Sequence, residues 1–201
     1  MTQQKSWGFP RWTLQSFILI RLQIDCAKFQ SYKAGTIVSK NSPAYWDTTK
    51  EPTKTQYELF LKHDSFGEAE YRELCNYTHA KGMDFTSTPF DYASADYLED
   101  MVDFYKISSS DLSNIPFIRH IGAKGKPVYM SVGAAYLSEV DVAIRALKES
   151  GCKDIVIFHC VLSYPTAPEN ANLRVIETLK KDFPDVRVGF SDHVAPDDTM
   201  M

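Results

Sequence analysis

The 201-residue chain is predicted to be an α/β protein, an incomplete (β/α)8 barrel of about six strand–helix units. Short apolar runs alternate with longer segments of helical periodicity, which indicates parallel strands joined by helical crossovers. Polar residues stand at the carboxyl ends of these runs, the edge at which parallel α/β proteins bind ligands. The clearest example is residues 189–193, Gly-Phe-Ser-Asp-His. No glycine-rich dinucleotide motif follows any strand, which favours a barrel over an open, doubly wound sheet.

Six strands are predicted from apolar runs that are typical of strands buried on both faces, at residues 26–29, 84–90, 104–107, 127–131, 154–160 and 186–190. Helical spacing predicts helices at residues 68–81, 94–101, 115–121, 137–150 and 172–183. Several of these segments are followed by a glycine, which favours the end of a helix. Residues 31–64 are too long for a simple connection, and we expect them to form a functional loop over the site.

The predicted strands are fewer than a whole barrel requires. A complete barrel needs eight strands and about 250 residues, so we expect at least one strand to be missing at each end. The chain is therefore divided into an atypical N-terminal segment, residues 1–24, and a partial barrel domain, residues 25–201. The apolar run 17–20 is too short to span a bilayer, and Arg21 interrupts it.

The composition of the chain argues against some classes of binding partner. The chain is 44% hydrophobic and 24% charged, with a net charge of −4, and it has no basic stripe that would neutralise nucleic-acid phosphates. The four cysteines form no Cys-x-x-Cys pair and are expected to be reduced thiols, mostly buried. We therefore expect a cytoplasmic protein that binds neither nucleic acid nor membrane.

One strand end combines a cation, hydroxyls and a carboxylate. Lys106 is followed by three serines at 108–110 and by Asp111, a set suited to holding a phosphate. The alternative is a serine-rich turn in which Asp111 caps the following helix. Ser131 and Ser191 stand at the ends of other strands and favour the phosphate site.

Other polar residues at the strand ends have alternative interpretations. His193 is a candidate metal ligand through a neutral ring nitrogen, or a histidine that is simply hydrogen-bonded. His159 lies inside an apolar strand and is expected to satisfy a core hydrogen bond. Lys28 ends a strand predicted to be buried, where a substrate phosphate or carboxylate would supply its partner. Tyr164 either lines the rim or packs against the protein.

Taken in order, these motifs resemble those of the sialic acid synthase family, which makes N-acetylneuraminate and related nonulosonates. The resemblance covers about residues 20–200 and depends on an ordered series of motifs, which is more specific than any one of them. The matching segments are residues 26–30, 87–91, 105–111, 125–127, 131–133, 159–160, 164–166, 169, 172–174 and 189–193.

The resemblance implies a TIM-barrel synthase that condenses phosphoenolpyruvate with an N-acetylated sugar aldehyde such as N-acetylmannosamine, releases phosphate and uses Mn²⁺ or Mg²⁺. It implies Lys106 and Asp111 as catalytic residues and His193 as a metal ligand. The matching positions that would bind phosphoenolpyruvate are Lys28, Lys106, Ser109, Ser131 and Ser191, and those that would line the acceptor pocket are Gln30, Thr88 and Tyr164. A homodimer is implied for the full-length protein.

The chain also departs from the family pattern. The glutamate motif of the family's first strand has no match in residues 1–24, and the resemblance implies that the second metal histidine and the C-terminal antifreeze-like domain fall outside these 201 residues. We therefore expect the 201-residue product itself to be inactive.

Three alternatives stay open. In the first, the acceptor is a different, diacetylated sugar that gives legionaminate or pseudaminate. In the second, the chain is another aldol-type barrel. In the third, it is a non-catalytic truncated barrel that binds ligand or pairs with an intact subunit.

Overall fold

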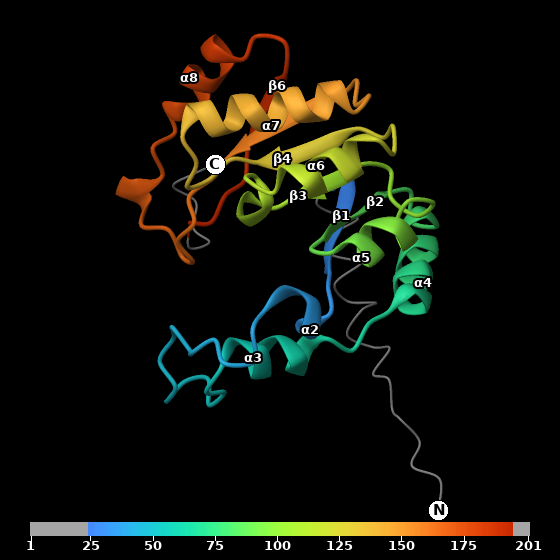
Figure 1. Cartoon of the computed structure of the whole chain (residues 1–201), viewed down its shortest axis with the longest axis vertical. Coiled ribbons are helices and arrows are strands. Elements are labelled where there is room, and N and C mark those ends of the chain that lie inside the picture. Colours follow the sequence, from blue (N-terminus) through green and yellow to red (C-terminus); the bar gives the residue numbers. More distant parts are fainter. Residues whose placement is uncertain (1–23, 195–201) are drawn as a thin grey trace, which may run out of the picture.

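The computed structural model describes residues 24–194, in which six parallel strands follow one another in chain order around a curved sheet (Figure 1). The backbone amide of Asp103 donates to the carbonyl of Phe85 at 3.0 Å and joins the first two strands to the other four. The strands are β1 (Cys26–Ser31), β2 (Asp84–Pro89), β3 (Tyr105–Ile107), β4 (Val128–Ser131), β5 (Ile155–His159) and β6 (Arg187–Phe190). All six predicted strands are confirmed. The predicted segment 1–24, with its apolar run, lies almost entirely outside the described residues.

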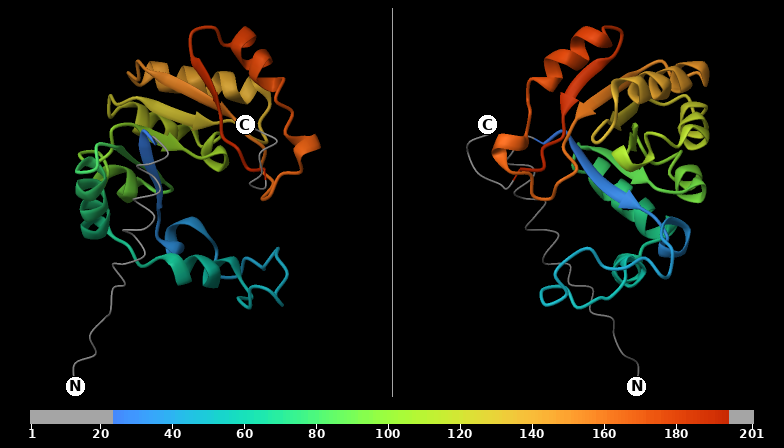
Figure 2. Two further views of the ribbon diagram at one scale, coloured as in Figure 1. Left: turned by 180° about the vertical axis from the view of Figure 1, so that it is seen from behind. Right: turned by 60° about the vertical axis from the view of Figure 1, so that its left-hand side comes forward.

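A helix lies in every crossover between consecutive strands, and these helices surround the outside of the sheet (Figures 1 and 2). The outer helices are α4 (Glu68–His79), α5 (Tyr92–Tyr97), α6 (Ile115–Gly122), α7 (Leu137–Glu149) and α8 (Val175–Asp182), with 3-10 turns η1 (Ser109–Asp111) and η2 (Pro168–Asn170). The described residues therefore have the alternating α/β order of a (β/α)8 barrel. No helix within residues 24–194 is long and apolar enough to cross a bilayer.

Local chemistry sets the ends of these helices. Gly82, Gly125 and Gly151 follow α4, α6 and α7 with φ values of 74°, 72° and 103°, so the predicted glycine stops are confirmed. Asp91 starts α5 by accepting a hydrogen bond from the amide of Ser94 at 2.6 Å. The helix predicted at 94–101 therefore begins earlier and ends at Tyr97.

One other expected helix start was wrong, and the alternative in which Asp111 caps a helix is excluded. The last helix begins at Val175 rather than at residue 172, because Asn172 has a left-handed φ of 49° that no α-helix accepts. The cap of α6 is Asn114, whose side-chain oxygen accepts from the amide of Phe117 at 3.4 Å, so Asp111 does not cap this helix.

Apolar residues that alternate along the strands face the outer helices and form the core. On β3, Tyr105 and Ile107 face the helices, and the Tyr105 hydroxyl donates to the carbonyl of Ala95 on α5 at 2.6 Å. The intervening Lys106 therefore faces the inner side of the sheet. Fully buried members of this core are Phe85, Tyr105, Ile107, Val128, Met130, Ile157, Phe117, Ile118, Ile121, Leu147 and Leu179.

The expectation that every strand is buried on both faces was wrong for the two ends of the described sheet. On β1, Lys28 and Gln30 are exposed, and β6 has no fully buried residue. Each of these strands pairs with a neighbour on only one side within the described chain, so its inner face is less covered than that of β3 or β4.

The segment predicted as a long functional loop contains two helices, α2 (Ala34–Ile37) and α3 (Gln56–His63). The Asp64 carboxylate closes its base by accepting from Lys33 Nζ at 2.7 Å and from the Ala34 amide at 2.8 Å. Figure 1 shows this segment projecting beyond the carboxyl ends of the strands.

Candidate active site

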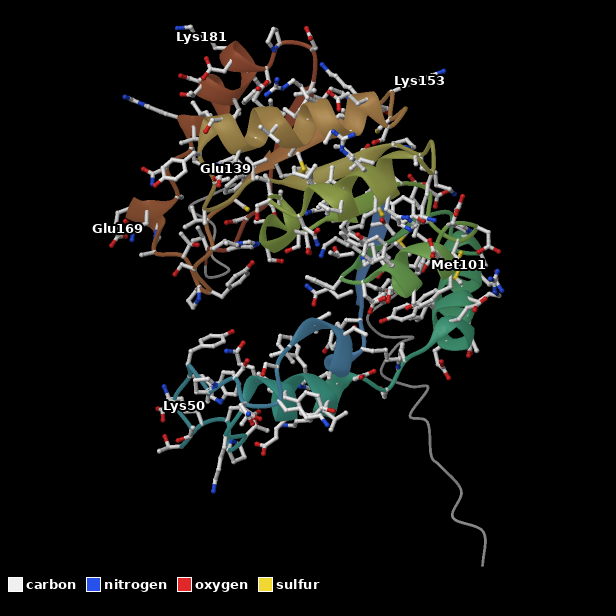
Figure 3. All side chains as sticks on the ribbon, viewed as in Figure 1. Lys50, Met101, Glu139, Lys153, Glu169 and Lys181 are labelled. Carbon is white, nitrogen blue, oxygen red and sulfur yellow. The ribbon has the colours of Figure 1, made fainter. Side chains whose placement is uncertain are left out.

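The polar residues predicted at the carboxyl ends of the strands lie at one end of the sheet, because all six strands are parallel. In Figure 3, the labelled Glu169, Glu139 and Lys50 lie on the side where the strands end, whereas Met101 and Lys153 lie where strands begin. This side is the face at which (β/α)8 barrels carry their active sites.

Lys106 is the central group of this face. Its side chain extends from β3 along the inner face, where Nζ donates to Ser131 Oγ at 2.6 Å and to the carbonyl of Ile107 at 2.7 Å. The residue is 7% exposed. Burial, followed by the positive charge of Lys28, lowers the pKa of the Lys106 ammonium to about 8. A buried ammonium that is held by neutral oxygens is suited to receiving an anion.

An aromatic ring packs beneath this ammonium. The Nζ of Lys106 lies 5.7 Å from the centroid of the Phe158 ring on β5. In the next strand, Gly189 pairs in register with Phe158, and a Cβ at Gly189 would lie 2.6 Å from the ring. Because Gly189 has no side chain, the Phe158 ring can occupy the space below Lys106.

A second polar group forms where β3, β4 and β5 end. The Oγ of Ser109 accepts from the amide of Gly133 at 3.0 Å and lies 3.2 Å from Sγ of Cys160. A Cβ at Gly133 would approach Cys160 Sγ to 2.7 Å, so this close arrangement requires glycine.

Four more of the predicted phosphate and acceptor residues lie on or just after β1, β2 and β6. Lys28 is exposed on β1, and the protein around it lowers the pKa of its ammonium by desolvation. Gln30 is exposed beyond it, whereas Thr88 on β2 is buried. Ser191 follows β6, where its amide donates to the carbonyl of His159 at 2.9 Å.

His193 has one ring nitrogen engaged, and its other ring nitrogen has no hydrogen-bond partner among residues 24–194. Its Nδ1 lies 2.6 Å from the carbonyl of Val161, which identifies this nitrogen as the protonated donor. The Nε2 lone pair is then the one that a metal would bind. The ring packs against that of Tyr164, with centroids 4.2 Å apart and the ring planes inclined by 36°, and Tyr164 is 71% exposed at the rim. Within residues 24–194 no group of three or more His, Cys, Asp or Glu converges on one point, so these residues do not form a complete metal site.

Two other residues singled out in the sequence, Asp111 and His159, have hydrogen-bond partners within the protein. Asp111 is half-buried, its carboxylate is engaged by Ser110 and Asn114, and burial raises its pKa. His159 satisfies the carbonyl of Ala171 through Nε2 at 2.7 Å, which confirms its expected hydrogen bond in the core. Three of the four cysteines are buried, as expected.

The sequence did not lead us to predict that Cys160 and Gly133 contact Ser109. The interpretation of the cysteines as inert buried thiols did not separate Cys160 from the others. A signal was present, because Cys160 stands at the end of a strand, as Lys106 and Ser131 do.

Comparison with known proteins agrees with this geometry. The NeuB family matches residues 19–200. The chain is 39% identical over 170 residues to a protein of Methanocaldococcus jannaschii, and 35% identical over 176 residues to an N,N'-diacetyllegionaminic acid synthase of Legionella pneumophila. Each match covers 84% of this chain, and 46% and 49% of the respective relatives. The chain thus spans about half the length of the curated relatives it matches.

A solved structure shows the same arrangement. The N-acetylneuraminic acid synthetase of Leptospira borgpetersenii, in complex with citrate, superposes with a TM-score of 0.75 at 29% identity, over 89% of this chain and 59% of that one. The ordered strand–helix units, the polar residues at their carboxyl ends and the extent of the sequence match lead to one assignment: the chain belongs to the NeuB family.

Proposed function

We propose that the full-length protein, as distinct from the 201-residue chain alone, condenses phosphoenolpyruvate with an N-acetylated amino sugar aldehyde to form a nonulosonic acid and releases phosphate. The observation that carries the proposal is Lys106, which is 7% exposed and has no carboxylate partner within residues 24–194. Keeping such a cation uncompensated is costly, and a phosphate dianion would remove the cost.

The reaction needs an anion site beside a carbon–carbon bond-forming site. Carbon 3 of phosphoenolpyruvate forms a bond to the aldehyde carbon, and the aldehyde oxygen takes up a proton. Water then adds at carbon 2, and the bond between carbon 2 and the phosphate oxygen breaks to release phosphate. These changes consume one water and need no oxidant or reductant.

The residues of this chain divide into two roles in the proposal. Lys106, Ser131 and Ser109 bind and orient the phosphate, with Lys28 and Ser191 completing the anion site. Gln30, Thr88 and Tyr164 line the acceptor pocket. Asp111 handles the attacking water, for which its burial-raised pKa is suited, because a carboxyl with a raised pKa exchanges protons nearer neutral pH.

The proposal includes Mn²⁺ or Mg²⁺, with His193 as one ligand through Nε2. When bound, the ion would polarise the aldehyde oxygen. His193 is the one ligand proposed within residues 24–194, where no group of three or more possible ligands converges. A homodimer and a cytoplasmic location also belong to the proposal.

A second acceptor has direct support. The relative from Legionella pneumophila, 35% identical, is an N,N'-diacetyllegionaminic acid synthase, whereas the structural match from Leptospira borgpetersenii, 29% identical, is an N-acetylneuraminic acid synthetase. Both N-acetylmannosamine and a diacetylated trideoxy sugar are therefore candidate acceptors.

The test is an acceptor-dependent assay of phosphate release. The intact protein is incubated with phosphoenolpyruvate, Mn²⁺ and either N-acetylmannosamine or 2,4-diacetamido-2,4,6-trideoxymannose, and both inorganic phosphate and the nonulosonate are quantified. We expect equimolar formation of the two products with one acceptor. Phosphate release that does not depend on either sugar, or no turnover with both, would contradict the proposal.

A further inference from the structure

The hydroxyl oxygen of Ser109 has two partners within the protein, the Gly133 amide and the Cys160 sulfur. A serine hydroxyl carries one proton to donate and two lone pairs that accept. The amide of Gly133 donates to Oγ at 3.0 Å and occupies one lone pair. The sulfur of Cys160, 3.2 Å away, is the second protein partner of the same oxygen.

Cys160 is held in this position by its surroundings. It is 4% exposed at the end of β5. Facing it, Gly133 approaches so closely that a Cβ would lie 2.7 Å from Sγ and 3.0 Å from the Cys160 carbonyl. The thiol is therefore confined against Ser109, and the steps of the proposed reaction make no use of it.

We propose that Cys160 is a positioning residue for the anion site. Its S–H donates to Ser109 Oγ, so that the thiol and the Gly133 amide together occupy both lone pairs. The Ser109 proton is then directed away from the protein, as a donor to an anion held by Lys106. The identity of the anion as phosphoenolpyruvate rests on the proposed function, whereas the hydrogen-bond arrangement does not.

If the hydrogen bond between Ser109 and Cys160 had the opposite donor, removing the thiol would have the opposite effect on anion binding. If Ser109 donated its proton to sulfur, an anion would have to break that bond, and removing the thiol would strengthen anion binding. If the thiol donates, removing it lets the Ser109 hydroxyl rotate, and anion binding weakens. The sign of the change in affinity therefore decides between the two.

The experiment is a double-mutant cycle on the intact protein. Calorimetry measures the Kd of inorganic phosphate and of phosphoenolpyruvate for the wild type, Cys160→Ala, Cys160→Ser, Ser109→Ala and the double variant Ser109→Ala/Cys160→Ala. We expect Cys160→Ala to raise both Kd values about three- to tenfold, the usual effect of one hydrogen bond. Cys160→Ser, which keeps a donor, should stay within about twofold of the wild type. In the Ser109→Ala background, Cys160→Ala should have no further effect, because the partner through which it acts is gone.

A matched control separates positioning from packing. Cys152 is also 4% exposed, and its thiol faces the carbonyls of Lys126 and Asp154. Cys152→Ala therefore creates a comparable cavity without touching Ser109, and it should lower the Tm without changing either Kd. In turnover assays, Cys160→Ala should raise the KM for phosphoenolpyruvate by the same factor as its Kd and leave kcat unchanged.

Several results would overturn the inference: tighter or unchanged anion binding in Cys160→Ala, failure of Cys160→Ser to restore affinity, or full additivity with Ser109→Ala. A wild-type protein that binds phosphate but makes no nonulosonate would contradict the proposed function alone, and the binding cycle would still decide the part of Cys160. A wild-type protein that binds neither anion would overturn both.

Discussion

The ammonium nitrogen of Lys106 lies 2.6 Å from the hydroxyl oxygen of Ser131, across neighbouring parallel strands. In the register of β3 and β4, Lys106 pairs with Tyr129, so the lysine side chain reaches one inward-facing position further along β4, to Ser131. A cation and a hydroxyl from two strands thus meet at the carboxyl ends of both, which is where an anion would approach.

Lys106→Met should separate anion binding from stability. Methionine fills a similar volume without a charge, so we expect the KM for phosphoenolpyruvate to rise on the order of 100-fold. The free energy of unfolding should stay equal or increase, because an uncompensated buried ammonium is removed. Steady-state kinetics and urea unfolding test both expectations. Lys153→Met, at an exposed lysine, is the control, and a large loss of stability in Lys106→Met would show that the ammonium supports the fold.

The lowered pKa of Lys106 predicts how affinity and stability depend on pH. Above about pH 8 the free protein loses the ammonium proton, so the affinity for phosphoenolpyruvate should fall by up to about tenfold per pH unit. The unfolded chain holds this proton up to its ordinary pKa of 10.5. Between these values the unfolded state binds more protons, and the wild type should therefore gain stability with rising pH.

To isolate the effect of this lysine, the affinity for phosphoenolpyruvate and the free energy of unfolding are compared between wild type and Lys106→Met. Calorimetry and urea unfolding measure them from pH 7 to 10. Other titrating groups cancel in the difference. Parallel curves for the two proteins would show that another group is responsible.

Gly189→Ala should disturb the site through Phe158. The added Cβ would lie 2.6 Å from the ring that packs below Lys106, so the ring must move. We expect a loss of about 1–3 kcal/mol in the free energy of unfolding, together with a higher KM for phosphoenolpyruvate. Gly35→Ala is the matched control, because no atom lies within 4 Å of its added Cβ. Equal stabilities of the two variants would contradict the packing seen between β5 and β6.

The Nε2 atom of His193, which has no hydrogen-bond partner among residues 24–194, predicts a metal requirement. A chelator such as EDTA should abolish acceptor-dependent phosphate release, and added Mn²⁺ or Mg²⁺ should restore it. His193→Ala should raise the Mn²⁺ concentration for half-maximal activity at least about tenfold. His120→Ala, which removes an imidazole paired with Asp96 at the surface, should leave this concentration unchanged. Activity that survives chelation would contradict the metal assignment.

Much of the fold could be predicted because its signals are local. All six strands and the glycine stops after α4, α6 and α7 are properties of a few consecutive residues. Helix starts were harder. The beginning of α5 depends on the capping geometry of Asp91, and that of α8 on the left-handed backbone of Asn172. Neither leaves a mark in the hydrophobic periodicity.

The candidate site was predicted in outline because parallel strands end at one edge. That rule is enough to bring Lys106 near Ser131. It does not say which side chains touch: Ser109 contacts the Gly133 amide and Cys160, and the Tyr164 ring packs at an incline against His193. These contacts depend on the stagger between strands and on the loops that follow them.

The sequence by itself determined the order of the strand–helix units and which polar residues stand at their carboxyl ends, since both follow from local alternation of apolar and polar residues. Only the tertiary structure decided that the Asp111 carboxylate is engaged by Asn114 and that Cys160 is confined against Ser109. The physical reason is that hydrogen bonds and steric contacts between distant segments are set by close packing in three dimensions, which residue order does not record.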